Sequence, residues 1–291
     1  MSKANGGKAH SAREKVAAQR SQARRAAARR RALTIGGSVV AVLAIVIALF
    51  AIKAAGSPAQ AGTVTSNPAV AREIATIPGS TFDAVGKGTA AGITQISGQP
   101  ELTVNGKPEV LYMGGEYCPY CAAERWAIAA ALSRFGTLSG VGFIHSSATD
   151  AYPNTPTLSF ANAKYTSKYV AFVPVEWYGQ KPDSSTPTGY AYLQKPTAQQ
   201  AALFAKYANG SFPFVDIGNR YLISGAQYLP SSLSGMTWAQ VASAMRNPNS
   251  AVAKDIDGAA NMIAAAISHL THGQPAGVSS SAGVKAAEGS I

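Results

Sequence analysis

The sequence has little charge and almost no cysteine. Charged residues make up 13% of the 291 residues, about half of the fraction that is usual in soluble domains. Two cysteines are too few for a disulfide-rich scaffold or for a Cys₄ zinc site. The chain also lacks a Gly-x-Ser-x-Gly nucleophile elbow and a phosphate-binding glycine loop. These absences argue against a serine hydrolase and against a P-loop protein.

Acidic residues are scarcer than basic ones, and the excess of positive charge is concentrated at the N-terminus. The chain has 25 Lys and Arg against 14 Asp and Glu. Residues 1–31 hold ten of the basic residues and one acidic residue, which leaves a formal charge of only +2 on the remaining 260 residues. We interpret the basic run as a tail, and the body of the protein is not expected to bind nucleic acid.

The longest stretch without charge is the apolar run at residues 32–52. A helix of 21 residues rises about 30 Å, so the run predicts a transmembrane helix. The arginines at 24–31 precede the run and only Lys53 follows it closely. The positive-inside rule therefore predicts a cytoplasmic tail at 1–31 and an extracytoplasmic remainder, in a single-pass protein of the cell membrane. A cleaved signal peptide with its small-residue site at 59–61 is the alternative.

The rest of the chain divides into a linker, a folded domain and a tail. Small and polar residues at 53–69 predict a linker, and the low-complexity segment at 273–291 predicts a disordered tail. Between them, periodicity and turn residues predict strands at 109–113, 141–145, 158–161, 169–178, 214–217 and 220–224, and helices at 122–135, 196–208, 237–245 and 252–270. Gly218 and Asn219 predict a hairpin turn between the last two strands. This order predicts an α/β domain with a mixed sheet at 70–272.

The two cysteines, Cys118 and Cys121, lie three residues apart between a predicted strand and a predicted helix. Pro119 suits the first position of a helix, which places Cys118 at the N-cap, where free N–H groups and the helix dipole stabilise a thiolate. Cys121, one turn further on, can then attack a mixed disulfide formed by Cys118. The spacing predicts a redox-active Cys118–Cys121 disulfide with Cys118 as nucleophile and Cys121 as resolving cysteine. An inert structural disulfide is the alternative, although so short a loop would add little stability.

The segment VLYMGGEYCPYC, ending at Cys121, resembles the thioredoxin superfamily, in which a strand and a turn lead to a CxxC at the start of a helix. The Pro-Tyr pair is the one common in glutaredoxins. SFPFV at 211–215 resembles the place where thioredoxin-like proteins carry a cis-proline against the CxxC. The resemblance implies a thioredoxin-like mixed sheet flanked by helices, with Pro213 in the cis form. The substrate-binding residues implied in this way are Phe212, Pro213, Tyr117, Pro119 and Tyr120.

A closer resemblance covers about residues 70–270. The runs CPYCAAERWAIAAALSRFG, YPNTP and FPFVDIGN are similar to a family of membrane-anchored thioredoxin-like proteins that is described only as a domain of unknown function. Two features depart from thioredoxin. Tyr112 stands six residues before Cys118, where related enzymes have a buried acid, and Glu116 is expected to be a solvated loop charge. Residues 146–210 are predicted to be a long insert before Pro213, either a second small core or a cover for the site.

We therefore expect a membrane-anchored, extracytoplasmic thiol–disulfide oxidoreductase that acts on exported proteins, as an oxidase or isomerase rather than a reductase. It would need no cofactor or metal, but a membrane redox partner would have to recycle it. Two alternatives remain open. Cys118, Cys121 and His145 could bind copper, or the cysteines could join His269 and His272 in a zinc site. The aromatic insert could instead serve a non-redox binding module.

Overall fold

The structure, a computed structural model, describes residues 63–291. The predicted tail at 1–31, the predicted transmembrane run at 32–52 and most of the predicted linker at 53–69 lie outside the described residues. Within the part of the chain that is described, no helix is both long and apolar enough to cross a bilayer.

The helices and strands follow one another in an α/β order. The helices are α2 (Pro68–Ala75), α3 (Gly79–Val85), α4 (Pro119–Ser133), α5 (Ala198–Tyr207), α6 (Trp238–Met245), α7 (Ala251–Leu270), α8 (Ala276–Ser279) and α9 (Ala282–Ala287), with 3₁₀ turns η1 (Pro230–Leu233) and η2 (Glu288–Ser290). The strands are β1 (Thr94–Gln95), β2 (Thr103–Val104), β3 (Lys107–Gly115), β4 (Gly136–Ser139), β5 (Gly142–His145), β6 (Pro156–Ser159), β7 (Lys164–Ser167), β8 (Ala171–Pro182), β9 (Tyr190–Tyr192), β10 (Phe214–Ile217) and β11 (Tyr221–Ser224).

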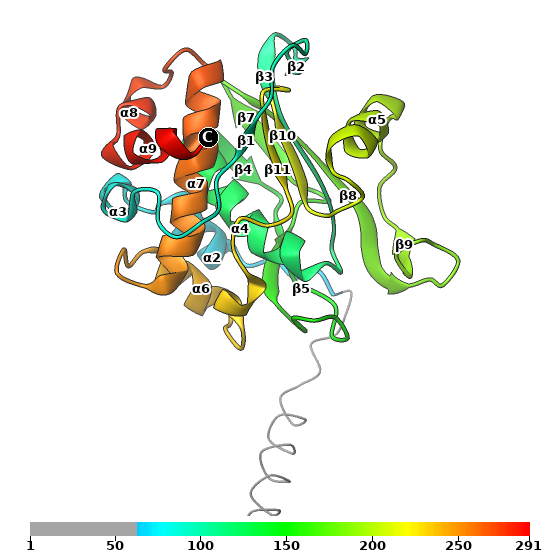
Figure 1. The fold of residues 1–291 in the computed structure, drawn as a ribbon. Coiled ribbons are helices and arrows are strands. Elements are labelled where there is room, and N and C mark those ends of the chain that lie inside the picture. Colours follow the sequence, from blue (N-terminus) through cyan, green and yellow to red (C-terminus); the bar gives the residue numbers. More distant parts are fainter. Residues whose placement is uncertain (1–62) are drawn as a thin grey trace, which may run out of the picture. The chain divides into compact units, whose positions relative to one another are not determined.

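A mixed sheet lies at the centre of these elements (Figure 1). Its strand order is β1-β11-β10-β3-β8-β9, and β2 pairs with the first two residues of β3. Strands β3 and β8 run parallel, whereas β10, β11, β1 and β9 each run antiparallel to their neighbours. The predicted α/β domain with a central mixed sheet flanked by helices is therefore confirmed. Strand β3, in the middle, ends three residues before Cys118.

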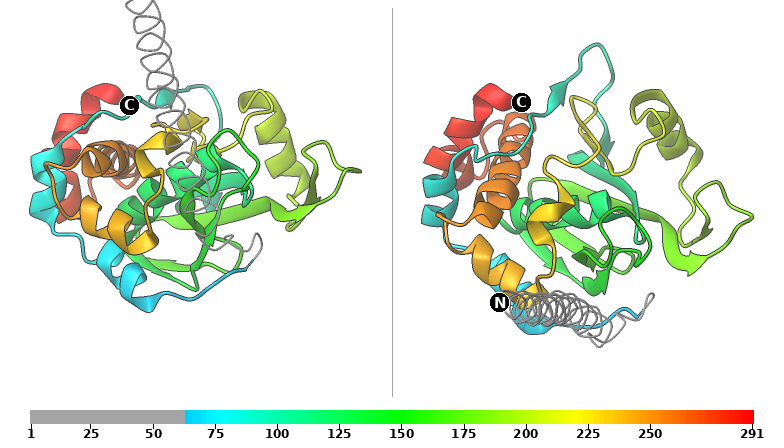
Figure 2. Two further views of the ribbon diagram at one scale, coloured as in Figure 1. Left: turned by 90° about the horizontal axis from the view of Figure 1, so that it is seen from below. Right: turned by 60° about the horizontal axis from the view of Figure 1, so that its bottom comes forward.

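The two faces of the sheet pack against different helices, because successive residues of a strand point to opposite sides. Val110 and Tyr112 of β3 belong to the main core, which α4 and α7 cover. Leu111 and Met113 belong to a second apolar cluster on the other face, against which Phe204 of α5 packs. Figures 1 and 2 show the result: α7 and the other C-terminal helices gather on one side of the sheet, and α5 lies apart on the other.

Helix α4, which follows the cysteines, is buried over almost its whole length. It is rich in alanine, and so is α7, which packs against it in the main core. Small side chains on both helices allow their backbones to come close, and a helix that is apolar on most sides is stable only in a core. The first turn of α4, and with it the CxxC, is thereby held on a rigid element.

The predicted insert at 146–210 needs correction. We expected the chain to leave the core here, yet β8 lies within this segment and pairs in parallel with β3 from Glu109↔Ala171 to Gly115↔Tyr178. The strand predicted at 141–145 is β5, which pairs with β6 in a small sheet separate from the central one. The true excursion is thus the stretch between α4 and β8, and the aromatic residues from Phe172 to Tyr178 lie on a strand of the central sheet.

The prediction of a disordered tail at 273–291 is wrong. This segment forms α8, α9 and η2, and Val284 and Ala287 on α9 are fully buried against the main core. The backbone of Gly283 contacts Phe82 closely, and a Cβ there would lie only 2.4 Å from the Phe82 carbonyl oxygen. The residues that made the segment look like low-complexity sequence, small glycines and alanines, are those that allow this close packing. The fold also starts before residue 70, since Thr65 pairs with Phe143.

Candidate active site at the start of α4

The two cysteines occupy the first turn of α4. Cys118 is the N-cap, with φ −76° and ψ 123°, and Pro119 takes the first helical position. The Cys118 Sγ accepts a hydrogen bond of 3.2 Å from the backbone N–H of Cys121. Both cysteines are free thiols in the structure. The local sequence explains this geometry, because a proline at the first helical position needs no hydrogen-bond partner for its nitrogen and requires an extended residue before it.

The environment of the two sulfurs separates their pKa values. Burial raises the pKa of the Cys118 thiol, but hydrogen bonds from Cys121, the charge of Arg125 and the backbone N–H of Tyr120 outweigh this, so that its pKa is lowered overall. Burial and the neighbouring Cys118 sulfur raise the pKa of Cys121 well above its usual range. Cys118 is 6% exposed and Cys121 is 0% exposed. The arrangement gives Cys118 the lower pKa and the slight exposure, and it places Cys121 fully buried behind it.

A buried ion pair lies next to the cysteines. The guanidinium of Arg125, on α4, donates hydrogen bonds of 2.8 and 2.7 Å to the carboxylate of Glu176 on β8, and both side chains are 0% exposed. Arg125 also donates to the Gly115 carbonyl at 2.8 Å, and Glu176 accepts from the backbone N–H of Phe160 at 3.0 Å. The pair thus ties together the helix of the CxxC and the end of β3. The pair was not expected from the sequence, although Glu124 and Arg125 are the two charged residues of a mostly apolar helix.

Tyr112 and Gly114 lie against the resolving cysteine. A Cβ on Gly114 would stand 2.1 Å from the Tyr112 hydroxyl and 3.1 Å from the Cys121 Sγ, so only glycine fits here. The Tyr112 hydroxyl is fully buried and has no hydrogen-bond partner among residues 63–291. Burial raises the pKa of Tyr112 well above its usual range. A neutral phenol therefore stands at the position where thioredoxins have an acid.

The side chain of Glu116 is buried, contrary to expectation. We predicted a solvated loop charge, but the side chain is 5% exposed, and its carboxylate accepts a hydrogen bond of 2.5 Å from the Ser159 hydroxyl. Burial raises its pKa above the usual value. The backbone hydrogen bond from Glu116 to the Tyr178 carbonyl continues the β3–β8 pairing past Gly115, and this draws the side chain into the protein.

Phe212 and Pro213 lie at the start of β10, beside β3. The Phe212–Pro213 peptide bond is cis, and the next residue, Phe214, pairs with Met113 of β3. The ring of Phe212 contacts the rings of Phe204, Trp177 and Tyr178, with centroid distances of 4.8, 6.0 and 6.0 Å. Phe212 is therefore held by aromatic packing from β8 and α5.

The other predicted substrate-binding residues belong to a group of tyrosines around the CxxC. Tyr117 stacks on Tyr190, with centroids 4.1 Å apart and rings nearly parallel, and it meets Tyr178 edge to face at 6.4 Å. Tyr120 is 37% exposed and packs edge to face on Tyr152 at 5.7 Å. Pro119 is buried in the first turn. The aromatic residues of 146–210, noted in the sequence without a defined place, supply most of this surround.

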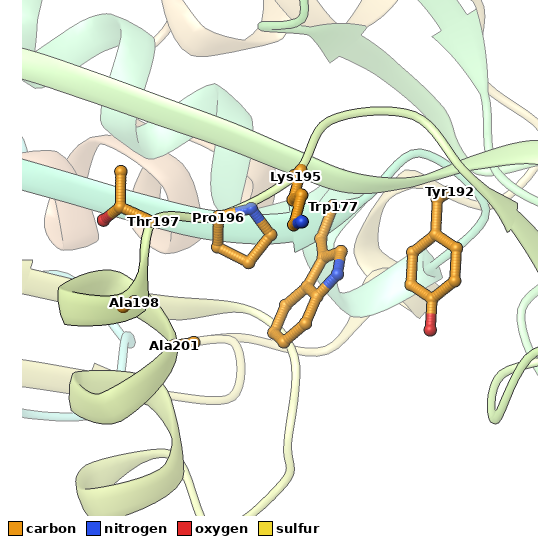
Figure 3. A pocket seen from close by; sticks show the side chains of 7 residues that line it. All are labelled: Trp177, Tyr192, Lys195, Pro196, Thr197, Ala198 and Ala201. Atoms are coloured by element: carbon orange, nitrogen blue, oxygen red, sulfur yellow. The ribbon is translucent and has the colours of Figure 1, made fainter.

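A cavity of about 790 Å³ lies between the end of the central sheet and α5. Its walls are mostly apolar, and the residues that line it are Trp177, Tyr192, Lys195, Pro196, Thr197, Ala198 and Ala201. In Figure 3 the indole of Trp177 stands between Pro196 and Tyr192, and the first turns of α5 lie below. No local pattern of residues predicts this cavity, because it forms only where β8, the β9–α5 connection and α5 meet.

The residues considered for metal binding are not brought together. His269 is hydrogen-bonded through Nδ1 to the Tyr221 hydroxyl at 2.7 Å, and the ring of His145 packs on Trp238 at 4.7 Å. Burial lowers the pKa of His145. In the described part of the chain, no three His, Cys, Asp or Glu side chains are grouped as a metal site would require.

Carboxyl groups buried away from the cysteines make stability depend on pH. Burial raises the pKa of Glu124 to about 7 and that of Asp257 to about 8. The folded state therefore binds protons that the unfolded chain, with carboxyl pKa values of about 4, has released. The stabilisation is complete below pH 4 and is lost as the pH rises to 8. We expect the melting temperature of the full chain to be higher at pH 5 than at pH 8, and Glu124→Gln to flatten this slope. An increase from pH 5 to pH 8 would contradict these assignments.

Comparisons with known proteins give a match at the level of a family. A family model described as a domain of unknown function (DUF929) matches residues 93–269, from just before β1 to the last turn of α7. Among curated proteins no significant match is found. The same holds for solved structures.

Proposed function

The chain belongs to the family described as a domain of unknown function (DUF929), whose description names no activity, and we propose from the site itself that it is a thiol–disulfide oxidoreductase of thioredoxin-like type. The observation that carries the proposal is the pair of thiols at the start of α4, of which Cys118 has a lowered pKa and Cys121 a strongly raised one. Such a pair can be oxidised and reduced by exchange alone.

Two features of the fold support the thioredoxin-like assignment. The CxxC follows the central strand β3 and opens α4, which is the strand–turn–helix order implied by the sequence resemblance. The cis peptide bond before Pro213 lies at the start of β10, the direct neighbour of β3. Both features stand at the same end of the sheet, since β10 starts opposite the last residues of β3.

The exchange proceeds in two steps that need no further reagent. In the oxidised protein, a substrate thiolate attacks the Cys118 Sγ, the Cys118–Cys121 bond breaks, and Cys121 leaves and takes up a proton. A second thiolate of the substrate then attacks the substrate sulfur of the mixed disulfide, and Cys118 leaves as a thiolate. The substrate gains a disulfide and the protein gains two electrons. In the reverse direction Cys121, once deprotonated, attacks Cys118 and releases the substrate as a thiol.

The electrostatics favour oxidation of the substrate. Arg125 and the N-terminal N–H groups of α4 stabilise the Cys118 thiolate, which exists only in the reduced protein. Stabilising the reduced form raises the reduction potential and makes the disulfide a better oxidant. This agrees with a role on exported proteins outside the membrane, where disulfides persist. A membrane redox partner that reoxidises the pair belongs to the same proposal, as does the anchor at 32–52.

The reduction potential of the Cys118–Cys121 pair tests the proposal. We expect the full chain in detergent, equilibrated with glutathione or dithiothreitol buffers, to titrate as a single two-electron couple. A potential nearer to about −120 mV than to about −270 mV would support an oxidant, and the opposite would reverse the direction of electron flow. A pair that does not titrate, or that retains copper or zinc through the titration, would overturn the assignment as an oxidoreductase.

A further inference from the structure

The cavity beside α5 is continuous with the aromatic surround of the CxxC. Trp177 lines the cavity and also contacts Phe212, with centroids 6.0 Å apart. Tyr192, on the opposite side of Trp177 from Pro196 in Figure 3, lines the cavity and stacks on Tyr178 at 4.9 Å. Tyr178 in turn contacts both Tyr117, next to Cys118, and Phe212. A substrate polypeptide bound across Phe212 and Pro213 would therefore extend to this cavity.

The lining of the cavity has the composition of a side-chain binding site. Most of it is apolar, and its volume is in the range of ordinary ligand pockets. At its rim Tyr192 is 59% exposed and the adjacent Leu193 is 46% exposed, so two large apolar side chains face water there. Apolar surface of this kind is stabilised when another apolar group covers it.

The lining of the cavity includes one positively charged side chain. Lys195 is the only charged residue among those that line it. Within residues 63–291, ion pairs join Arg125 to Glu176 and Lys285 to Glu288, and neither involves Lys195. The ammonium is therefore available to a carboxylate brought by an occupant. Charge complementarity therefore favours an occupant that carries an acidic group next to its apolar one.

We propose that this cavity is a specificity site for the substrate polypeptide, which takes a large apolar side chain with an Asp or Glu next to it in sequence. The proposal rests on the proposed function and names its substrate class. Two ring contacts lead from Phe212 through Tyr178 to Tyr192. The contacts span 6.0 and 4.9 Å between ring centroids, and an extended chain advances about 3.3 Å per residue. The apolar residue therefore lies within about three positions of the substrate residue that rests on Phe212, and a spacing of three is the one to test.

Four peptides with a single cysteine test this site. Each carries Phe or Ser three residues from the cysteine, followed by Glu or Lys. The readout is the rate at which the peptide opens the Cys118–Cys121 disulfide of the full-length protein to a mixed disulfide at Cys118, which a second peptide molecule then resolves as the peptide disulfide. We expect the Phe-Glu peptide to react fastest, and replacing Phe by Ser to cost about tenfold, as is usual for the loss of one apolar group from a pocket. Tyr192→Ala should remove the preference for Phe. Lys195→Glu should reverse the preference between Glu and Lys.

Two controls separate this proposal from the one on which it rests. Lys206→Glu changes an exposed lysine of α5 outside the lining, and the order of the four peptides should stay as in the unaltered protein. Dithiothreitol, which has no side chain for the cavity, measures exchange at the cysteines alone. If dithiothreitol reduces the protein and the four peptides react equally, the specificity site is overturned and the oxidoreductase stands. If dithiothreitol also fails, the oxidoreductase assignment itself falls.

Discussion

Full-length protein with Cys121→Ser is expected to accumulate in cells as covalent complexes with other proteins, whereas Cys118→Ser is expected to form none. The reason lies in the first turn of α4. Cys118 has the lowered pKa and the residual exposure, so it forms the mixed disulfide, and Cys121 is fully buried behind it. Without Cys121 nothing in the site can attack that disulfide, and the complex persists. Non-reducing gels of cells trapped with acid and blocked with an alkylating agent would measure it.

The matched control is the protein that carries both substitutions. It keeps the α4 N-terminus and the neighbouring ion pair but has no thiol, and it should resemble Cys118→Ser in every lane. Complexes formed equally by both single variants would contradict the assigned roles of the two cysteines. An absence of complexes from both would leave the redox proposal without support and would favour the alternative of a binding module.

The second large effect is expected in stability. Glu176→Ala leaves the Arg125 guanidinium charged and unpaired in a site where both side chains are 0% exposed. Removing one partner of a buried ion pair typically costs about 3–5 kcal/mol. For a domain of this size the melting temperature should fall by roughly 10 °C. Thermal unfolding of the full chain, followed by circular dichroism in detergent, measures the change.

A variant without either charge isolates the ion pair from the packing. Arg125→Met with Glu176→Leu should recover most of the lost stability, since apolar residues of similar size often replace a buried pair at no cost. Its Cys118 thiol should nevertheless react more slowly with iodoacetamide near pH 7, because Arg125 no longer lowers the pKa. Glu288→Gln, which breaks the exposed Lys285–Glu288 pair, should leave the melting temperature nearly unchanged. An equally large fall for Glu288→Gln would contradict the argument from burial.

Elements whose signals are local could be predicted from the sequence. The hairpin of β10 and β11 follows the expectation, because Gly218 and Asn219 both adopt the positive φ that a two-residue turn needs. Helix α7 begins at Ala251, one residue before its predicted start, after Ser250 has capped it. The place of the CxxC at the start of a helix also follows from adjacent residues, since Pro119 and Cys118 are neighbours.

Features that depend on distant residues could not be predicted. The extended aromatic stretch at 169–178 was predicted, but nothing in it indicates that β8 pairs with β3 in the central sheet rather than belonging to a second, separate core. Arg125 and Glu176 are 51 residues apart, and no pattern around either residue indicates that the two form an ion pair. The wrong prediction for 273–291 has another cause: a composition of small residues is shared by disordered segments and by helices that pack closely, and the sequence alone does not separate the two.

For the proposed exchange, the slight exposure of Cys118 limits which cysteines can approach it. With 6% of the residue exposed, we expect Cys118 to react with a cysteine on a narrow, flexible segment of polypeptide rather than with one set in the flat surface of a folded protein. Timing then becomes a form of selectivity. A newly exported chain passes through a period in which its cysteines are still on loose segments, and the protein would act in that interval and leave the finished, folded product untouched.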